Sequence, residues 1–165
     1  MSDDLYKQAA EIIKSIKYIN LATVTSDSMP WNSPVYCAYD SDLNFYWLSW
    51  KENQHSINIH QNENVFATLY NSTVAEGTGF GVYFQGTARK IEEIPLLIKA
   101  LKLCYSRKDK KARAVKLFLT SYPRRVYQFS PKKIWVNGDD LIRGNFIDVR
   151  HELDFKILKK ELKNV

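Results

Sequence analysis

The chain has 165 residues, of which 45% are hydrophobic, and this is enough for one domain with a substantial buried core. No apolar stretch approaches the ~20 residues that span a bilayer, and the acidic, then amphipathic N-terminus is unlike a signal peptide, so we expect a cytoplasmic protein. The net charge of +6 is uneven: residues 1–90 hold 6 Lys+Arg and 9 Asp+Glu, whereas residues 91–165 hold 18 and 9, which makes a polyanion a candidate partner of the second half.

The first half of the chain predicts one helix followed by short strands. Asp3 or Asp4 caps an amphipathic helix with Ile12, Ile13 and Ile16 on its apolar face. Runs rich in β-branched and aromatic residues, separated by turn residues such as Asp40-Ser41-Asp42, predict strands. These strands are expected at 18–25, 33–40, 43–50, 64–71 and 82–91, with a short helix within 51–64 and a bulge or bend at Gly86.

The second half mixes helix and strand. Residues about 94–120 predict a helical region that starts near Pro95 and ends at Pro123, and strands and a basic amphipathic tail follow over 124–165, with a break at Pro131. The basic run 107–116 is either a solvated helix face or interhelical turn, or a surface for a polyanion.

About six short strands with flanking helices predict a mainly β protein. The gaps between the early strands are of turn length and no βαβ alternation occurs, which favours a closed or partly closed antiparallel barrel over a parallel sheet. We expect one domain over residues 1–165, because the chain has no linker, repeat or low-complexity tract.

Several kinds of chemistry are not indicated. His55, His60 and His151 lack metal-ligand spacing, and Cys37 and Cys104 are expected to be buried thiols in a reducing compartment, so no metal site is predicted. The GTGFG segment precedes a strand and so is no dinucleotide fingerprint, and neither a P-loop nor a GxSxG elbow occurs. If the protein is an enzyme, a cofactor carries the chemistry.

A polar cluster follows the aromatic strand FYWLSW. Its members are Ser49, Lys51, Asn53, Gln54 and His55. They either cap a short helix at the surface or converge, with the backbone N–H groups of the helix start, on an anion such as a phosphate monoester. The residues alone leave both readings open.

The order and spacing of several segments resemble one known family. LATVTSDSMPWNSPV, LNFYWLSW, NENVFATLY and VYFQGTARKI are similar, over about residues 18–91, to the pyridoxamine 5′-phosphate oxidase-like family of FMN-binding split barrels. The resemblance implies a six-stranded antiparallel split β-barrel with flanking helices, and a homodimer that holds FMN at the subunit interface.

The resemblance also implies site residues. Ser33, Pro34, Val35 and Tyr36 would lie along the flavin, and Tyr46 and Trp47 would approach the ribityl phosphate. Asn53, Gln54 and His55 match the phosphate-binding loop if two extra residues are allowed; without that gap, Ser49 and Lys51 take those places. If His55 lies close to the phosphate, its pKa is raised and the affinity weakens as the pH rises through that value.

The chain also departs from the family pattern. Vitamin B6 oxidases have a glutamine at the position of Gly81, and here the nearby Gln85, which is offset from it, is the candidate cofactor-binding residue. Trp135 matches the tryptophan of the family's C-terminal motif and is expected in the core or the dimer interface rather than at the cofactor. Of the motif's arginines after this tryptophan, Arg143 is the one that remains, and Asn145 stands where the family has its final arginine. These departures argue against vitamin B6 oxidase activity.

The sequence thus predicts an FMN-binding flavoprotein, an oxidoreductase with hydride transfer through flavin N5 and an unidentified small-molecule substrate. One alternative is a basic β-barrel that binds single-stranded nucleic acid, although the aromatic residues gather at 31–84 and the positive charge lies after residue 89. A second alternative is the same barrel with haem or a deazaflavin in place of FMN.

Overall fold

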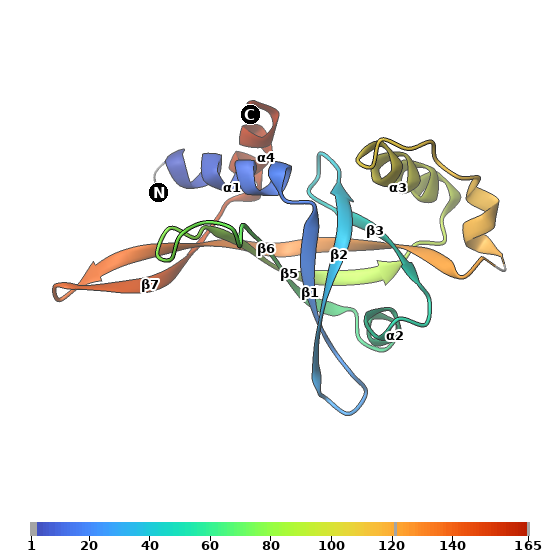
Figure 1. Ribbon diagram of the computed structural model, residues 1–165, viewed down its shortest axis with the longest axis horizontal. Coiled ribbons are helices and arrows are strands. Elements are labelled where there is room, and N and C mark those ends of the chain that lie inside the picture. Colours follow the sequence, from blue (N-terminus) through green and yellow to red (C-terminus); the bar gives the residue numbers. More distant parts are fainter. Residues whose placement is uncertain (1–2, 121, 165) are drawn as a thin grey trace.

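A closed ring of six antiparallel strands forms the centre of the computed structural model, which describes residues 3–120 and 122–164 (Figure 1). The ring runs β3-β2-β1-β4-β5-β6 and closes because β3 also pairs with β6. The barrel predicted from the sequence is therefore confirmed. In chain order the elements are α1 (Asp3–Ser15), β1 (Tyr18–Val24), β2 (Pro30–Tyr39), β3 (Phe45–Trp50), α2 (Gln54–Gln61), β4 (Asn64–Tyr70), β5 (Gly81–Lys90), α3 (Ile94–Ser106), the 3-10 helix η1 (Val115–Leu119), β6 (Arg124–Ile142), β7 (Asn145–Glu152) and α4 (Phe155–Asn164).

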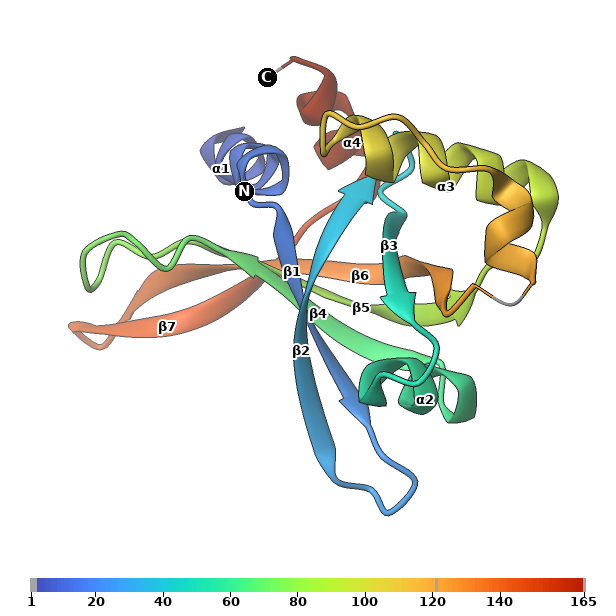
Figure 2. The same ribbon diagram turned by 45° about the vertical axis from the view of Figure 1, so that its right-hand side comes forward.

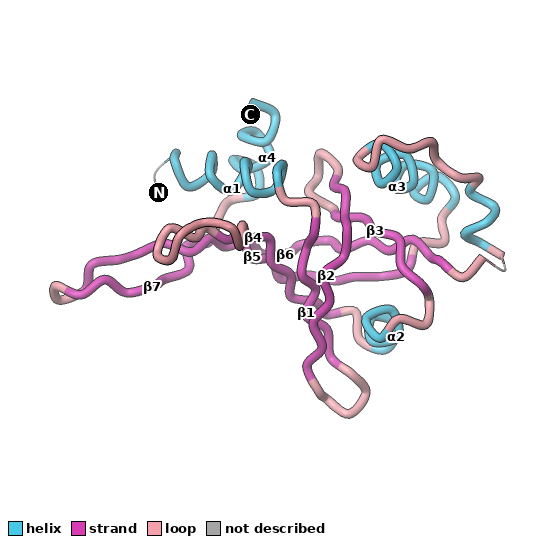
Figure 3. The backbone as a smooth tube through the Cα atoms, viewed as in Figure 1, coloured by secondary structure: helices cyan, strands magenta, loops and turns pink. Residues whose placement is uncertain are grey.

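Two β-hairpins extend beyond the ring. The ends of β1 and β2 project past α2, and β6 continues into a two-stranded arm with β7 on another side of the molecule (Figures 1 and 3). The sequence analysis did not separate β7 from the tail. Its charged residues Asp148, Arg150 and Glu152 alternate with Ile147, Val149 and His151, a short pattern that only the pairing with β6 identifies as a strand.

The strand β3 is buried on both faces, which explains its unbroken run of large apolar residues. Phe45 and Trp47 face the barrel interior, whereas Tyr46 faces a second core beneath α3. This second core joins Leu97 and Leu101 of α3 to the outer side of β3, and so fixes the helix to the barrel.

Helices close both ends of the barrel. Ala9 and Ile13 of α1 and Leu158 of α4 enter the same core as the inward strand residues, and α1 and α4 pack together at one end (Figure 1). Ile59 of α2 enters that core from the other end. No helix among residues 3–120 and 122–164 is long and apolar enough to cross a membrane.

The helical region expected over 94–120 is shorter than predicted. The helix α3 ends at Ser106, Asp109 has a φ of 53°, and residues 110–114 are non-helical before η1 begins at Val115. The reason is that Lys110-Lys111-Ala112-Arg113-Ala114 has no large apolar side chain to bury, so a continued helix would gain nothing from packing. The basic run 107–116 is thus mostly a loop.

The break expected at Pro131 is also absent, because β6 is one strand of 19 residues. Gly86 pairs with Pro131 and Gln85 with Lys133, so the register shifts by one residue at the bulge predicted for Gly86. Pro131 lies beyond Phe129, the last β6 residue paired with β3, so its missing N–H removes no bond on that side.

Candidate functional site

The corner between β3 and α2 holds a buried network of the predicted polar residues. Ser49 Oγ lies 2.7 Å from His55 Nε2, and Asn53 Nδ2 donates to the same Oγ at 2.8 Å. The Ser49 and His55 residues are each only 6% exposed. The three side chains therefore bond to one another and order the corner, and Ser49 and His55 do not present donors to solvent.

Burial also decides the charge of His55. Because desolvation penalises the imidazolium form, it lowers the pKa of His55 below its ordinary value. The sequence-based expectation of a raised pKa depends on a phosphate next to this ring. In the structure the ring faces Ser49 inside the protein.

Two donors of the same corner remain accessible. Lys51 has a side chain that is 53% exposed and lies 3.9 Å from the Glu52 carboxylate. The helix α2 begins at Gln54, and its N-cap residue Asn53 makes no side-chain capping bond, because its amide is bound to Ser49. The first turn of α2 contains no acidic residue, and the N–H groups of Ser56 and Ile57 bond to the Asn53 carbonyl oxygen. An anion at the positive dipole end can therefore use the N–H groups of Gln54 and His55.

A chain of hydrogen bonds links this corner to the β1–β2 hairpin. Gln54 Nε2 donates to Asn58 Oδ1 at 2.8 Å, and Asn58 Nδ2 donates to Thr23 Oγ1 at 2.9 Å. Thr23 Oγ1 in turn donates to the Trp31 carbonyl oxygen at 3.4 Å. Asn58 is fully buried, so this link holds α2 and β2 in a fixed relation.

The predicted flavin-contacting residues of β2 alternate between its two faces. Pro34 and Tyr36 lie on the outer face, Val35 points into the barrel core, and Ser33 accepts a 3.0 Å bond from Trp31 Nε1. The Tyr36 hydroxyl donates to the Arg107 carbonyl oxygen at 2.6 Å. Only the outer residues of the predicted set can present side chains to a ligand.

Tyr46 and Trp47 are both fully buried. Trp47 stacks on Tyr127 with ring centroids 5.6 Å apart. The Tyr46 hydroxyl donates to Asp40 at 2.8 Å, and burial followed by this contact raises the pKa of Tyr46 above its ordinary value. The structure thus does not bring these two side chains to the corner, and their backbones pair with β2 on one side and β6 on the other.

Gln85 and Trp135 belong to the outer face of the sheet rather than to the corner. Strand pairing aligns Pro34, Asn20, Thr68, Tyr83 and Trp135 in one row across five strands. The adjacent row, in the same strand order, is Asn32, Ala22, Phe66, Gln85 and Lys133.

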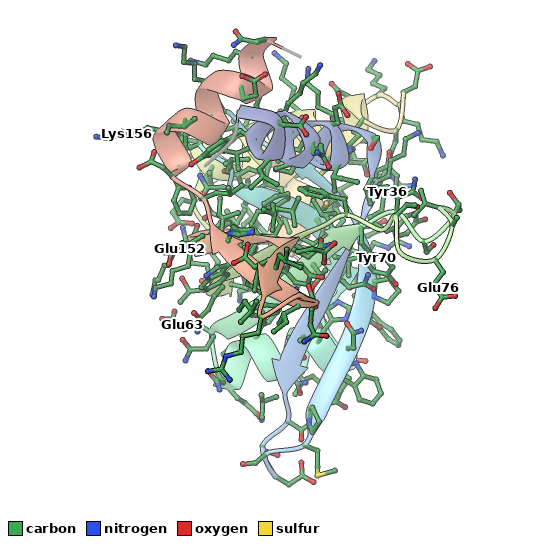
Figure 4. All side chains as sticks on the ribbon, turned by 90° about the vertical axis from the view of Figure 1, so that its left-hand side faces the viewer. Tyr36, Glu63, Tyr70, Glu76, Glu152 and Lys156 are labelled. Carbon is green, nitrogen blue, oxygen red and sulfur yellow. The ribbon has the colours of Figure 1, made fainter. Side chains whose placement is uncertain are left out.

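An aromatic group on this face escaped the sequence analysis. Phe66 stacks on Trp135 with centroids 6.4 Å apart, lies 6.4 Å from Tyr83, and is itself 41% exposed. The alternation of β4, which places Phe66 and Tyr70 opposite the buried Val65, Ala67 and Leu69, is the signal that identifies it. In Figure 4, Tyr36 and Tyr70 lie on the same side of the molecule, the side of the loop that carries Glu76.

A groove of about 610 Å³ runs between α2 and the ends of β5 and β6. Ile57, Ile59 and Ala88 line its apolar part, and His60 and Lys51 stand on its α2 side. Arg89 and Lys90 also line it, but they pair with Glu93 at 2.8 Å and Glu92 at 2.7 Å.

The two cysteines are free and buried, as predicted. Burial raises the pKa of Cys37 and of Cys104 to about 12, so both remain thiols near neutral pH. Among residues 3–120 and 122–164, no cluster of His, Cys, Asp and Glu side chains is placed to hold a metal ion.

The chain matches the family model of pyridoxamine 5′-phosphate oxidase over residues 5–137. No curated protein matches it in sequence. Solved structures with the same fold include a heme binding protein from Mycobacterium smegmatis, 16% identical, with a TM-score of 0.66 over 94% of this chain and 60% of that chain. This chain thus spans less than two thirds of that protein.

Two further structures are matched by this chain over most of their length. The heme storage protein HutZ from Vibrio cholerae is 16% identical, with a TM-score of 0.64 over 78% of this chain and 92% of that chain. A putative pyridoxamine 5′-phosphate oxidase from Listeria innocua is 18% identical, with a TM-score of 0.61 over 80% of this chain and 97% of that chain. At these identities the likeness concerns the fold.

Proposed function

This chain belongs to the pyridoxamine 5′-phosphate oxidase family, whose model matches residues 5–137, and we propose that it is an FMN-binding flavoprotein that acts as an oxidoreductase. The observation that carries the proposal is the chain of hydrogen bonds from Gln54 through Asn58 and Thr23 to Trp31. It ties the start of α2 to the β1–β2 hairpin, so an anion-binding point at the helix and the β2 strand keep a fixed relation.

The accessible donors suit the phosphate of FMN. The phosphate is close to a dianion near neutral pH, and the N–H groups at the start of α2 together with the Lys51 ammonium group offer it charge-assisted hydrogen bonds. Ser49, Asn53 and His55 hold this corner in place from behind, because their side chains bond to one another. Of the two registers that the sequence left open, this arrangement favours contact through Lys51 and the backbone at Gln54.

The outer face suits a flat aromatic ring and a second protomer. Pro34 lies on the outer face of β2, and the Phe66–Trp135 stack lies on the same face of the sheet, in the adjacent rows. A large exposed aromatic group on a sheet is typical of a surface that another protein chain covers. We therefore propose a homodimer with FMN at the interface, in which Trp135 contacts the partner rather than the flavin.

Bound FMN would supply a hydride acceptor at its N5 atom for a small-molecule substrate. The residues of this chain would bind the phosphate, orient the ring along β2 and exclude water from it. Neither His55, which is buried against Ser49, nor the Tyr36 hydroxyl of β2, which is bound to Arg107, is placed as a general acid or base.

The test is the absorbance spectrum of the purified full chain, before and after incubation with FMN and gel filtration. We expect the two bands of oxidised flavin at about one FMN per chain, because each chain has one such corner. Dithionite should bleach these bands. Protein that leaves the column without flavin absorbance after incubation with excess FMN would exclude this function.

Haem is the second candidate, and the groove beside α2 favours it. His60 provides an exposed imidazole, Ile57, Ile59 and Ala88 an apolar wall, and Lys51 a cation for a propionate. A volume of about 610 Å³ is within the usual range for small-molecule sites.

The same spectrum distinguishes the two candidates. Haem gives an intense Soret band, and if His60 supplied its imidazole ligand, that band would shift in His60→Ala. Flavin bands without any Soret band after incubation with hemin would exclude the haem candidate.

A further inference from the structure

A second cleft lies outside the barrel, on the far side of α3 from the corner described above. Its floor is the β2–β3 turn, and its walls are α3 and α4, which stand on either side of that turn (Figures 1 and 2). It has a volume of about 500 Å³, well within the range of small-molecule sites.

The two helical walls carry the same pattern. On α3, Lys99, Lys102 and Leu103 face the cleft, together with Ser106 one turn later. On α4, the spacing i, i+3, i+4 brings Lys159, Leu162 and Lys163 to the cleft. Each wall thus contributes one leucine and two lysines, and Tyr39 adds an aromatic ring at the base.

The turn neutralises only part of this charge. Lys99 Nζ lies 2.6 Å from Asp40 Oδ2, and Lys159 Nζ lies 3.2 Å from Asp42 Oδ1. Among the described residues, Lys102 and Lys163 make no ion pair within 4.0 Å. Two ammonium groups, one on each wall, therefore face a shared hollow without a carboxylate of the described residues within 4.0 Å.

Asp40 anchors this arrangement. Its side chain is 3% exposed and accepts bonds from Lys99, from the Tyr46 hydroxyl and from the Asn44 backbone N–H. Because the Asp40 carboxylate already bonds to these three groups, it holds Lys99 at the rim of the cleft and does not neutralise the charge of Lys102 or Lys163. Leu103, Leu162 and Tyr39 leave an apolar surface between the charged groups.

We propose that the cleft between α3 and α4 is a second binding site, which takes a soluble phosphate monoester with an apolar or aromatic body. A phosphate monoester carries close to two negative charges near neutral pH, which matches the two unpaired lysines. Its apolar body would lie against Leu103, Leu162 and Tyr39. The site is independent of the flavin corner and shares no residue with it.

The experiment is calorimetric titration of the full chain with three probes. 4-Nitrophenyl phosphate has both the charge and the apolar ring, inorganic phosphate has only the charge, and 4-nitrobenzyl alcohol has only the ring. We expect 4-nitrophenyl phosphate to bind at least about tenfold more tightly than either of the others. Equal affinity for all three probes would overturn the proposal.

Matched variants assign the binding to the cleft. Lys102→Gln/Lys163→Gln should weaken 4-nitrophenyl phosphate binding at least about tenfold, whereas the control Lys7→Gln/Lys132→Gln removes the same charge elsewhere and should leave it unchanged. All four lysines are exposed, so both double variants should fold, which circular dichroism checks. Unchanged affinity in the cleft variant would overturn the proposal.

Two further arms separate other sources of phosphate binding. Loss of binding in Lys51→Glu, with retention in the cleft variant, would place the ester at the flavin corner and overturn the second site. Vesicles that contain phosphatidic acid present a phosphate monoester on a membrane. Co-sedimentation of the protein with these vesicles, without binding of 4-nitrophenyl phosphate, would overturn the proposal of a soluble ligand. FMN absorbance of the cleft variant, expected to be unchanged, keeps this result separate from the proposed function.

Discussion

Ser49 Oγ and His55 Nε2 lie 2.7 Å apart inside the corner between β3 and α2, and Asn53 completes the group with a 2.8 Å bond. The residues that the sequence offered as phosphate donors therefore bond to one another and support the corner from inside. This contact also leaves Lys51 and the start of α2 as the accessible donors.

The buried His55 should make folding stability depend on pH. Its folded pKa is lowered by desolvation, so between the ordinary value of about 6.5 and the lower folded value the unfolded chain binds more protons than the folded one. Stability is therefore full above about pH 6.5 and is lost as the pH falls through this window. Urea unfolding at a series of pH values measures it.

The variant His55→Gln should reduce that slope, because glutamine does not titrate, whereas the exposed His60→Gln should keep it. A slope that is the same in both variants would contradict the assignment to His55.

Lys51→Glu should weaken FMN binding about ten- to a hundredfold, since it replaces an attractive charge at the phosphate by a repulsive one. Lys51 is exposed and pairs only distantly with Glu52, so the melting temperature should hardly change. Fluorescence quenching of FMN measures the affinity. The control Lys132→Glu carries the same charge change on β6, and an equal loss in both variants would count against a specific phosphate contact.

Phe66→Glu should convert the proposed dimer into a monomer. The substitution places a charge in the stack with Trp135, which the second protomer would have to bury. Light scattering coupled to gel filtration gives the mass. Ile94→Glu, an exposed position at the start of α3, is the control and should remain dimeric. A wild-type protein that is monomeric at all concentrations would refute the dimer.

Asp40→Asn should lower the free energy of unfolding by about 2 kcal/mol near neutral pH, because the charge-assisted bond to Lys99 is lost. Burial raises the pKa of Asp40, but the bonds from Lys99, Tyr46 and Asn44 outweigh it and hold the pKa below its ordinary value. The carboxylate therefore stabilises the fold above its ordinary pKa of about 3.9, and this contribution is lost as the pH falls through the lower folded value.

The difference between wild type and Asp40→Asn should accordingly shrink in acid, which denaturant titrations at neutral and acidic pH would reveal. A difference that stays constant down to the acid limit would mean that the charge of Asp40 contributes nothing.

Gly86→Ala should destabilise the barrel by at least about 2 kcal/mol. The added Cβ would overlap the Ser130 carbonyl oxygen and lie 2.7 Å from the Cα atom of Pro131, and both belong to backbone that cannot move without breaking the bulge. Gly79→Ala is the control, since a Cβ there meets nothing within 4 Å. Similar melting temperatures for both variants would show that the bulge can adapt.

Local patterns were sufficient for most of the elements and for the barrel. Alternation with β-branched and aromatic residues gave β1 to β5 within a few residues, and Gly86 marked the bulge. The prediction of a strand break at Pro131 was wrong because a proline breaks a strand only where its N–H is needed for pairing. Pro131 lies at a register shift, where the strand tolerates the missing N–H. The helical region expected over 94–120 was too long, because charged residues with high helix propensity do not form a helix without an apolar face to bury. The alternative of an interhelical turn within the basic run 107–116 agrees with the structure.

The sequence by itself indicated a mainly β barrel, since strand alternation and turn residues are local properties, and the order of its motifs resembles the pyridoxamine 5′-phosphate oxidase family, to which the chain belongs. Only the tertiary structure decided which polar residues are accessible. Ser49 and His55 look like surface donors in sequence, but the turn from β3 into α2 directs them at each other. Likewise, Lys102 and Lys163 are 61 positions apart in the sequence and line the same cleft only because α4 packs beside the β2–β3 turn opposite α3. Proximity of side chains from distant segments depends on how the elements pack and not on their separation in the sequence.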